Sequence, residues 1–301
     1  MASTILVTGG AGFLGANILI QAGKGILVHA VDLAPLPLER KNLTWHALDL
    51  SDNEALRRLF LVLKPDAVIH TAALSDIDFC EANPQRAEAV NVGASLRIAE
   101  LCRISGTRLV YFSSDSVFDG KKGRYAETDA PEPINQYART KVAAEAGIAR
   151  ICPDHVIIRP SLIMGLPVLE SGNSFLWRLV QSLKGGVPSG LTSTEIRTPV
   201  DVITLSRATL ECAAAGFTGP LHLAGNDRLS RYEIGLRIAR ALGHPEALIV
   251  DKKPEIATGR AQRPVDASLD NARAKSLLAT PMLGFDEALR LVIENKGEKD
   301  L

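Results

Sequence analysis

The sequence contains few cysteines and few aromatic residues. Only four cysteines occur among its 301 residues, and Phe, Trp and Tyr together make up 5%. The cysteines stand far apart and form no Cys-x-x-Cys pair, and no histidine lies at metal-ligand spacing. This distribution argues against a disulfide framework and against a zinc site. We therefore expect reduced, mostly buried thiols and no bound metal.

The chain also has no excess charge of either sign, because 34 Lys and Arg balance 34 Asp and Glu. Nucleic acids and anionic membrane surfaces attract proteins that have a clustered positive charge. No apolar run approaches the ~20 residues of a membrane span. The first ten residues, "MASTILVTGG", lack the charged and then apolar pattern of a signal peptide. We expect no nucleic-acid partner, no membrane association and a cytoplasmic location.

The first half of the chain alternates short apolar runs with helical patterns. The strand-like runs lie at residues 4–10, 26–33, 66–73, 108–118 and 155–161, and the helical patterns at 11–23, 52–63, 84–106 and 134–152. Continuous apolar strands that alternate with helices indicate a parallel sheet covered on both faces. Right-handed crossovers then give a doubly wound α/β sheet of the Rossmann type.

After Pro160 the alternation loosens, and Gly and Pro become frequent between residues 165 and 199. Helical patterns still occur at 173–186, 201–216, 229–243 and 285–297, with short strand patterns at 219–225 and 247–253. We predict an NAD(P)-binding Rossmann domain at 1–160 and a smaller α/β lobe at 161–301 that mainly binds substrate. Parts of this second segment, such as 201–216, are expected to return to the Rossmann domain.

The run "TGGAGFLG" follows the first predicted strand and opens the first helix. In this position Gly9 permits a tight turn, Gly12 lets the backbone approach a pyrophosphate, and Gly15 lets the helix pack closely. The helix N-terminus adds free N–H groups and a partial positive charge. The run therefore predicts a dinucleotide site, with Phe13 and Leu14 also lining the cofactor.

The acid at the end of the second predicted strand bears on the choice of cofactor. There the Asp32 carboxylate can accept hydrogen bonds from both hydroxyls of the adenosine ribose, and it would repel a 2′-phosphate. Asp32 thus favours NAD, with NADP possible. Asp49 and Leu50 follow the next strand and are expected near adenine, although Asp49 can equally cap a helix. Ala72 and Ala73 are expected to line the same site.

A candidate catalytic pair lies on the helix at 134–152. Tyr137 and Lys141 are four residues apart and so share one helical face. The pKa of a free phenol is about 10. An ammonium and an oxidised nicotinamide nearby would lower this pKa and make the phenol a usable proton donor or acceptor. The preceding strand ends in "SSDSVFDG", where a serine can polarise the same substrate carbonyl.

The order "TGGAGFLG", "HTAA", "SSDSVFDG" and "YARTK" resembles the extended short-chain dehydrogenase/reductase family. The resemblance implies that Ser114 is the catalytic hydroxyl and Tyr137 the catalytic acid/base. It implies that Lys141 lowers the pKa of Tyr137 and binds the nicotinamide ribose. Asn91 matches a residue that often supports a proton-relay water, or it is an ordinary polar residue of the helix. Ser113 is expected to contact the cofactor.

Within that family the chain is most similar to the dTDP-4-dehydrorhamnose reductase branch, on "SSDSVFDG", "AETDAPEPINQYARTK" and "RPVDASLDNARAKSLL". This implies NAD(P)H-dependent reduction of a 4-keto group on a nucleotide-linked deoxysugar, with the proton from Tyr137. Ser114 stands where the branch often has Thr, which keeps the hydroxyl. Ser116 stands where it usually has Tyr, which leaves the sugar open. The resemblance also implies a homodimer formed through helices around 87–105 and 136–151.

Five residues are candidates for substrate contacts. Asp115 can orient a substrate hydroxyl or serve only as a turn aspartate. Arg197 and Arg263 can face a substrate phosphate, since a guanidinium fits a diphosphate well, or can be exposed arginines. Asn173 belongs to the "GNSF" match of the branch. Phe175 can stack on a base or sugar, or pack within a helical core.

Two alternatives to a reductase stay open. One is an NAD-dependent nucleotide-sugar epimerase on the same scaffold, and the other is a non-catalytic NAD(P)-binding regulatory subunit. A dehydratase usually needs an Asp-Glu pair, and "SSDSV" contains only the Asp. The intact set of Ser114, Tyr137 and Lys141 favours an enzyme.

Overall fold

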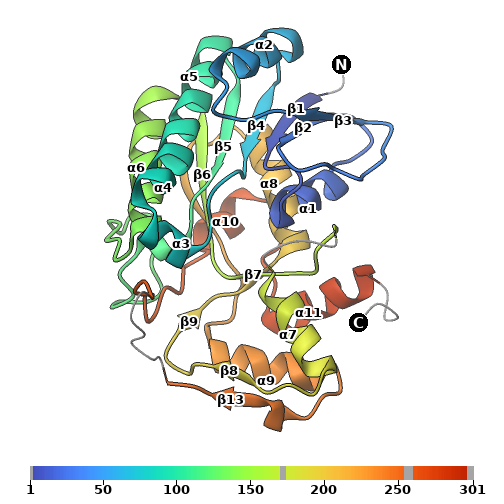
Figure 1. Cartoon of the computed structure of the whole chain (residues 1–301), viewed down its shortest axis with the longest axis vertical. Coiled ribbons are helices and arrows are strands. Elements are labelled where there is room, and N and C mark those ends of the chain that lie inside the picture. The colour runs from blue at the N-terminus through green and yellow to red at the C-terminus, as the bar shows by residue number, and fades with distance from the viewer. Residues whose placement is uncertain (1–2, 170–173, 254–259, 297–301) are drawn as a thin grey trace.

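A seven-stranded parallel sheet forms the centre of the computed structural model, which describes residues 3–169, 174–253 and 260–296 (Figure 1). The strand order is β11-β6-β5-β4-β1-β2-β3. The strands are β1 (Ser3–Thr8), β2 (Ile26–Asp32), β3 (Leu43–Ala47), β4 (Ala67–His70), β5 (Arg108–Phe112), β6 (His155–Pro160) and β11 (Gly219–Leu223). The order reverses between β1 and β4, and doubly wound sheets bind ligands at such a point. The predicted doubly wound α/β fold is confirmed.

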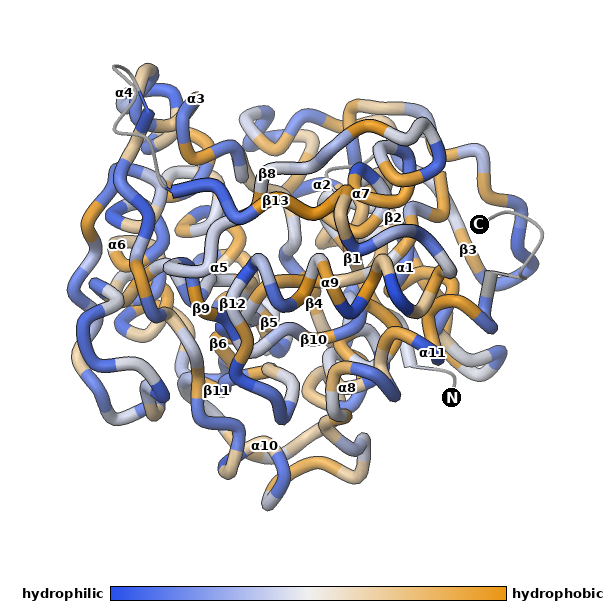
Figure 2. The backbone as a smooth tube through the Cα atoms, turned by 90° about the horizontal axis from the view of Figure 1, so that it is seen from below, coloured by the Kyte–Doolittle hydropathy of each residue, from blue (hydrophilic) through white to orange (hydrophobic). Residues whose placement is uncertain are grey.

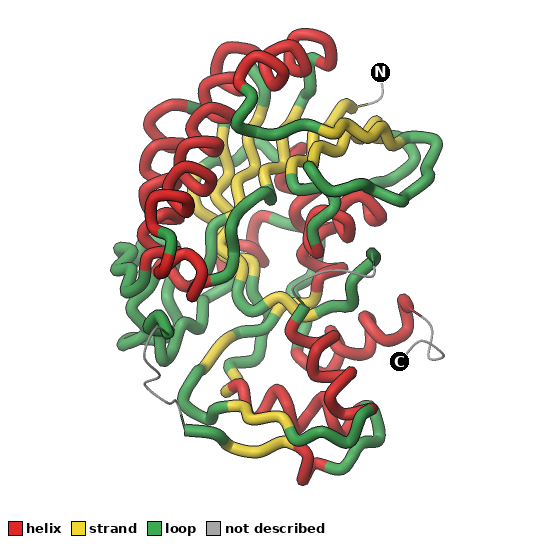
Figure 3. Tube along the Cα trace, viewed as in Figure 1, coloured by secondary structure: helices red, strands yellow, loops and turns green. Residues whose placement is uncertain are grey.

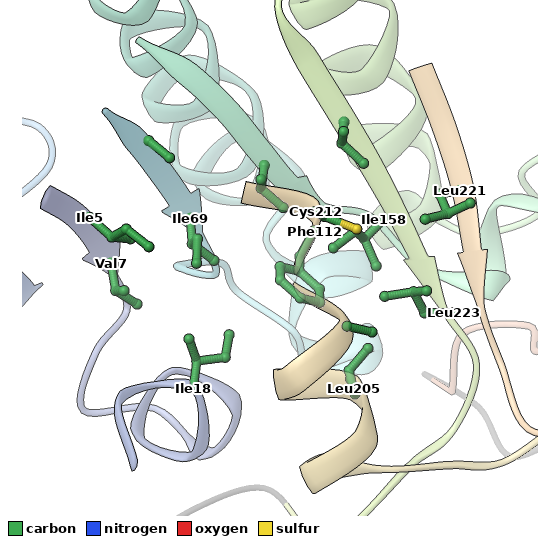
Figure 4. Packing of buried hydrophobic residues seen from close by; sticks show 14 of the residues in the cluster. Ile5, Val7, Ile18, Ile69, Phe112, Ile158, Leu205, Cys212, Leu221 and Leu223 are labelled. Atoms are coloured by element: carbon green, nitrogen blue, oxygen red, sulfur yellow. The ribbon is translucent and has the colours of Figure 1, made fainter. Parts of the chain in front are cut away.

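Helices cover both faces of this sheet (Figures 1 and 3). One face carries α2 (Asn53–Leu63), α5 (Ser95–Ser105) and α6 (Gln136–Ile151), and the other carries α1 (Phe13–Gln21), α8 (Val202–Ala214) and α10 (Ala272–Leu277). Successive residues of β1 point into different layers. Ile5 packs in the core with α1 and α8, whereas Leu6 packs in the core with α2, α5 and α6. Figure 4 shows Ile18 of α1 and Leu205 of α8 in the same cluster as Phe112. Burial on both faces explains why the strands read as continuous apolar runs.

The second half of the chain builds a smaller lobe below the carboxyl ends of the central strands (Figures 1 and 2). Its elements are α7 (Phe175–Lys184), α9 (Arg231–Ala241), α11 (Phe285–Lys296) and the short strand pairs β7 (Ile163–Met164) with β10 (Val200–Asp201), β9 (Ile196–Arg197) with β12 (Leu229–Ser230), and β8 (Ser189–Leu191) with β13 (Ile249–Asp251). The lobe has its own apolar core. Ser230 caps α9, and Glu233 completes a capping box with it. In the second half of the chain, β11 extends the central sheet and α8 packs against it. The two regions therefore interleave along the chain, and the domain boundary at residue 160 stays a prediction.

One predicted helix has an irregular centre. The pattern at 84–106 forms α4 (Pro84–Glu88), a π-helical turn η1 (Ala89–Ala94) and then α5. Turns of this kind occur frequently at functional sites, and this one carries the buried Asn91. A single widened turn hardly changes the spacing of apolar residues, so the sequence pattern did not reveal it. The remaining short helices are α3 (Ile77–Ala82), η2 (Asp115–Val117) and η3 (Glu246–Leu248).

Among the described residues, no helix has the length and apolar character needed to span a membrane. The four cysteines are buried free thiols. No group of three or more His, Cys, Asp and Glu side chains within the described ranges could hold a metal ion.

A buried ion pair holds α6 against β6 and yields a stability prediction. The Arg159 Nη2 donates to Glu145 Oε2 at 2.6 Å, and the side chains are only 5% and 8% exposed. Glu145→Ala leaves a buried guanidinium without its counter-charge, so we expect the free energy of unfolding to fall by about 3–5 kcal/mol. Urea denaturation measures this loss.

The matched control is Glu54→Ala, which removes a helical pair with Arg58 at 3.7 Å whose side chains are 67% and 64% exposed. Exposed pairs of this spacing contribute about 0.5 kcal/mol or less. Equal losses of the free energy of unfolding in the two variants would contradict the larger contribution expected of the buried pair.

Candidate active site

The glycine run forms the turn between β1 and α1. Gly9 has φ +72°, a region that favours glycine, and a Cβ on it would lie 2.7 Å from the Ala72 nitrogen. A Cβ on Gly15 would lie 2.0 Å from the Gly9 oxygen, so Gly15 permits the close approach of α1. Gly12 precedes α1 without a side-chain cap. The turn therefore leaves the helix N-terminus open to a phosphate.

The next residues of the run extend this site toward the lobe. Phe13 and Leu14 begin α1 and pack, half-buried, against the apolar core of the lobe. The end of β2 supports the turn from the other side. There Asp32 Oδ2 accepts the Ala11 N–H at 3.0 Å, and Oδ1 accepts the Leu33 N–H at 2.7 Å. Asp32 thus lies beside the glycine turn, where the ribose role predicted from the sequence requires it.

A cavity of about 320 Å³ lies between the end of β3 and the π-helical turn, a volume within the range of ligand pockets. It brings together the predicted cofactor residues Asp49, Leu50 and Ala72; its other lining residues are Ser51, Ala89, Val90, Gly93, Ala94 and Arg97. The N–H of Ser51 donates to Asp49 Oδ1 at 2.8 Å and lowers the pKa of that carboxyl. Asp52, and not Asp49, caps α2.

The end of β5 and the start of α6 meet at the predicted catalytic residues. Lys141 Nζ donates to the Phe112 carbonyl at 2.9 Å and lies 5.8 Å from the centroid of the Tyr137 ring. Lys141 is 3% exposed, and Tyr137 is also buried. Asn135 caps α6 by accepting the Ala138 N–H at 2.9 Å. The two side chains thus share one helical face, as the spacing predicts.

Burial controls the protonation of this pair. It raises the pKa of Tyr137 well above its ordinary value; the Ser114 hydroxyl lowers that pKa, and the charge of Asp115 raises it. Burial also lowers the pKa of Lys141 to about 8, and Glu145 opposes this shift. In the protein alone, removing water from the phenolate outweighs the favourable interactions, and the lowered phenol pKa expected beside an oxidised nicotinamide stays a prediction. Tyr137 is therefore a protonated phenol at neutral pH.

The carboxylate of Asp115 is fully engaged by the protein. Its Oδ1 accepts the hydroxyls of Ser114 and Ser116, each at 3.3 Å, and its Oδ2 accepts the Ser161 hydroxyl at 3.1 Å. The Nε of Arg197 lies 3.4 Å from Oδ2. Burial raises the pKa of Asp115, and the charge of Arg197 opposes that shift. Asp115 holds the Ser114 hydroxyl in place and has no oxygen left without a protein partner.

Two further predicted residues complete the catalytic side of the site. Asn91 Oδ1 accepts the Leu74 N–H at 2.8 Å, and its Nδ2 donates to the Thr140 hydroxyl at 3.1 Å. Asn91 therefore ties the loop that follows β4, where Ala73 lies, to α6. The Ser113 hydroxyl is buried and has no hydrogen-bond partner among the residues that the structure describes. An unsatisfied hydroxyl at this point fits a polar group of a ligand.

The two arginines predicted to face a phosphate both have protein partners. Besides its contact with Asp115, Arg197 Nη1 donates to the Ile196 carbonyl at 2.7 Å and the Pro264 carbonyl at 3.1 Å. Arg263 Nη2 donates to Asp78 Oδ2 at 2.7 Å. These contacts fasten the segment around residue 264 to the carboxyl end of the sheet.

A third arginine of the lobe, Arg231, belongs to no motif of the sequence. The Cζ of Arg231 lies 4.1 Å from the centroid of the Phe175 ring. Arg231 stands between the N-cap Ser230 and the capping-box residue Glu233. Helix capping alone accounts for this stretch of sequence, so the pattern gives Arg231 no role of its own. Phe175 is 8% exposed and belongs to the lobe core. Asn173 lies outside the described residues.

The parts of the site together fit a nicotinamide dinucleotide. The glycine turn suits a pyrophosphate, the cavity beside Asp49 suits an adenine, and Asp32 suits a ribose. The unsatisfied Ser113 hydroxyl and the Lys141 ammonium lie at the carboxyl end of β5. The residues present thus match the donor set that such a cofactor needs.

Three of the proteins to which the chain is similar bear on its function. Methionine adenosyltransferase 2 subunit beta of Danio rerio is 29% identical over 296 residues, which cover 91% of this chain and 89% of that protein. The dTDP-4-keto-6-deoxy-D-glucose reductase of Streptomyces niveus is 27% identical over 286 residues, which cover 94% of each chain. The crystal structure of dTDP-4-dehydrorhamnose reductase from Bacillus anthracis in complex with NADP has a TM-score of 0.88 at 21% identity. It covers 98% of this chain and 100% of its own, and shows a shared fold.

The family comparison confirms the resemblance drawn from the motifs. The model of the RmlD substrate binding domain matches residues 3–297, which is nearly the whole chain. The chain belongs to the RmlD substrate binding domain family.

Proposed function

We propose that the protein is an NAD(P)-dependent oxidoreductase that reduces the 4-keto group of a nucleotide sugar. The observation that carries the proposal is the convergence of Tyr137, Lys141 and Ser114 at the carboxyl end of β5, on the same edge as the glycine turn. Family membership and the similarity to a Streptomyces reductase of a dTDP-4-keto-6-deoxy sugar support this substrate class.

The chain's own residues perform the proton chemistry in this proposal. The bound cofactor supplies the hydride. Tyr137, kept protonated by burial, donates its proton to the carbonyl oxygen of the substrate. The Ser114 hydroxyl, which donates to Asp115 in the protein alone, would turn its single proton from that carboxylate to the same substrate oxygen. Lys141, held by the Phe112 carbonyl, places a positive charge near the phenolate that remains.

The lobe contributes to this chemistry through Arg197. Asp115 anchors the Ser114 hydroxyl, but its negative charge also disfavours the Tyr137 phenolate. Arg197 lies 3.4 Å from Asp115 and compensates that charge. In this proposal Arg197 is a positioning residue, because it acts on the reaction through Asp115 and Ser114.

A second candidate function is a non-catalytic NAD(P)-binding regulatory subunit. The similarity to methionine adenosyltransferase 2 subunit beta favours it. The retained Tyr137 and Lys141, buried against the end of β5, favour the enzyme instead.

NADH oxidation with a panel of 4-keto nucleotide sugars separates these functions. Stoichiometric loss of NADH with turnover is the result expected of a reductase. An isomerised sugar without loss of NADH would instead indicate an epimerase. A complete lack of turnover, combined with tight binding of a protein partner, would indicate the regulatory function.

Removing the proton donor should stop the reaction. In Tyr137→Phe the phenol that protonates the carbonyl oxygen is lost, so we expect turnover to fall by about 10²-fold or more. NADH affinity, measured by fluorescence titration, should be unchanged. Tyr125→Phe deletes a phenol that donates to Asp119 at 2.5 Å, outside the site, and serves as the control. Full activity of Tyr137→Phe would overturn the assignment.

The ammonium of Lys141 should set the alkaline limit of activity. Its pKa is lowered to about 8 by burial, so the charged form is lost as the pH rises through about 8. We expect kcat/KM for reduction to be flat below this value and to fall above it. Lys141→Arg keeps its charge at much higher pH, so the decline should move upward. An alkaline limit that stays in place in this variant would exclude Lys141 as its cause.

The charge of Asp32 should determine cofactor preference. Asp32→Ala removes both the ribose acceptor and the repulsion of a 2′-phosphate, so the ratio of kcat/KM for NADH over NADPH should fall. Asp32→Asn removes the charge but keeps an oxygen that can accept the Ala11 N–H. This variant therefore distinguishes the repulsion of a 2′-phosphate from the structural support that Asp32 gives to the glycine turn. An unchanged ratio in both variants would reject the ribose role.

A further inference from the structure

Arg231 is an arginine of the lobe without a counter-charge of its own. Its guanidinium forms no hydrogen bond or ion pair with any residue in the described ranges 3–169, 174–253 and 260–296. Its backbone N–H donates to the Glu195 carbonyl at 2.9 Å. The guanidinium instead lies over the ring of Phe175, with its Cζ 4.1 Å from the centroid.

The charged groups around Arg231 are already paired with other residues. Its neighbours of negative charge are Glu195 and Asp115, and those of positive charge are Arg197 and Arg178. Asp115 faces Arg197 at 3.4 Å. Glu195 faces the Nη2 of Arg260 at 3.8 Å. Each nearby carboxylate thus has another arginine, and the charge of Arg231 is in excess at this place.

The environment makes this excess charge costly to leave unpaired. Arg231 is partly exposed, and the burial of the rest of its side chain lowers its pKa to about 10, so the group stays charged at neutral pH although it is incompletely hydrated. An incompletely hydrated charge without a counter-ion is unfavourable. An anionic ligand would supply both the missing charge and the missing hydrogen-bond acceptors.

We infer that Arg231, supported by the ring of Phe175, is an oxyanion-binding site that takes the diphosphate of the nucleotide-sugar substrate. The planar fork of a guanidinium matches two phosphoryl oxygens. Contact with the aromatic ring holds the fork in one plane before the ligand arrives. The helices α7 and α9 begin at Phe175 and Arg231, so both helix N-termini add positive potential to the site. The diphosphate assignment rests on the proposed function, whereas the oxyanion site itself does not.

This assignment changes the expected roles of the lobe residues. Arg197 and Arg263 hold Asp115 and Asp78, so their guanidinium groups fasten the lobe to the Rossmann domain. Phe175 supports a cation with its ring and does not need to stack on a base. Arg231 takes over the phosphate contact that the sequence assigned to the other two arginines.

The test is the binding of dTDP to the NADH-loaded full-length protein, measured by calorimetry. In Arg231→Gln we expect the Kd for dTDP to rise about tenfold or more, because charge-assisted hydrogen bonds to phosphate are lost. NADH affinity should not change. UDP and inorganic pyrophosphate are titrated in parallel, since they share the diphosphate and differ in the base.

A matched control lies on the same helix. Arg237 also faces a phenylalanine, with its Cζ 5.8 Å from the Phe285 ring, but its guanidinium pairs with Asp286 at 3.2 Å. Arg237→Gln should therefore leave the Kd for dTDP unchanged. Arg231→Lys keeps the charge without the planar fork, and a smaller rise in Kd is expected for it. If Arg231→Gln does not fold, the Kd of Arg231→Lys for dTDP decides the test.

Three results would overturn the inference. The first is wild-type affinity for dTDP in Arg231→Gln or, if that variant does not fold, in Arg231→Lys. The second is a wild-type protein that binds neither dTDP, UDP nor pyrophosphate. The third is D-glucuronate binding that depends on Arg231 while dTDP binding does not, which would assign the site to a carboxylate. None of these measurements requires turnover, so a protein that binds dTDP through Arg231 but reduces no 4-keto sugar would refute only the proposed reaction.

Discussion

Burial of the central sheet on both faces is the constraint that places the polar groups of the site that follow its strands. The strands β4, β5 and β6 contribute almost entirely buried side chains to the two flanking cores. Within such a sheet an unpaired polar side chain is unfavourable, so the reactive groups follow the last apolar residue of each strand. Phe112 ends β5, and Ser113, Ser114 and Asp115 come directly after it. Since parallel strands end on one edge, the glycine turn after β1 and these serines lie on that same edge.

The ion pairs that cross this edge connect the lobe to the residues of the proposed reaction. Arg197 comes from the short strand β9 of the lobe and meets Asp115, which holds the Ser114 hydroxyl. Arg263 follows the lobe strands and meets Asp78 on α3. The position of the lobe is therefore coupled to the orientation of a hydroxyl that the proposed reaction uses. A shift of the lobe relative to the sheet would change the orientation of the Ser114 hydroxyl through the Arg197–Asp115 ion pair rather than through direct contact with Ser114.

The sequence predicted what depends on local patterns and missed what depends on partners distant in the chain. The glycine spacing, the apolar strands and the four-residue step from Tyr137 to Lys141 are local, and the structure has the turn, the sheet and the shared helical face that they predict. The pairing of Arg197 with Asp115 joins residues far apart in the chain, so no spacing rule could anticipate it. Arg231 was overlooked because its significance lies in lacking a partner. The π-helical turn under Asn91 leaves almost no trace in the periodicity of apolar residues.

The protonation of the site favours one direction of the proposed chemistry. Burial raises the pKa of Tyr137 and lowers that of Lys141, so it favours the neutral form of both groups. A protonated phenol is the reactant that carbonyl reduction requires, because the carbonyl oxygen gains a proton as the hydride arrives. Alcohol oxidation requires the phenolate, which burial and the Asp115 charge both oppose. An epimerase must carry out both half-reactions on the same tyrosine, whereas a reductase needs only the favoured one. The electrostatics of Tyr137 in the protein alone therefore suit the proton-donating half-reaction that both enzymes share, and the positive charge of an oxidised nicotinamide would be needed to favour the phenolate in the other half.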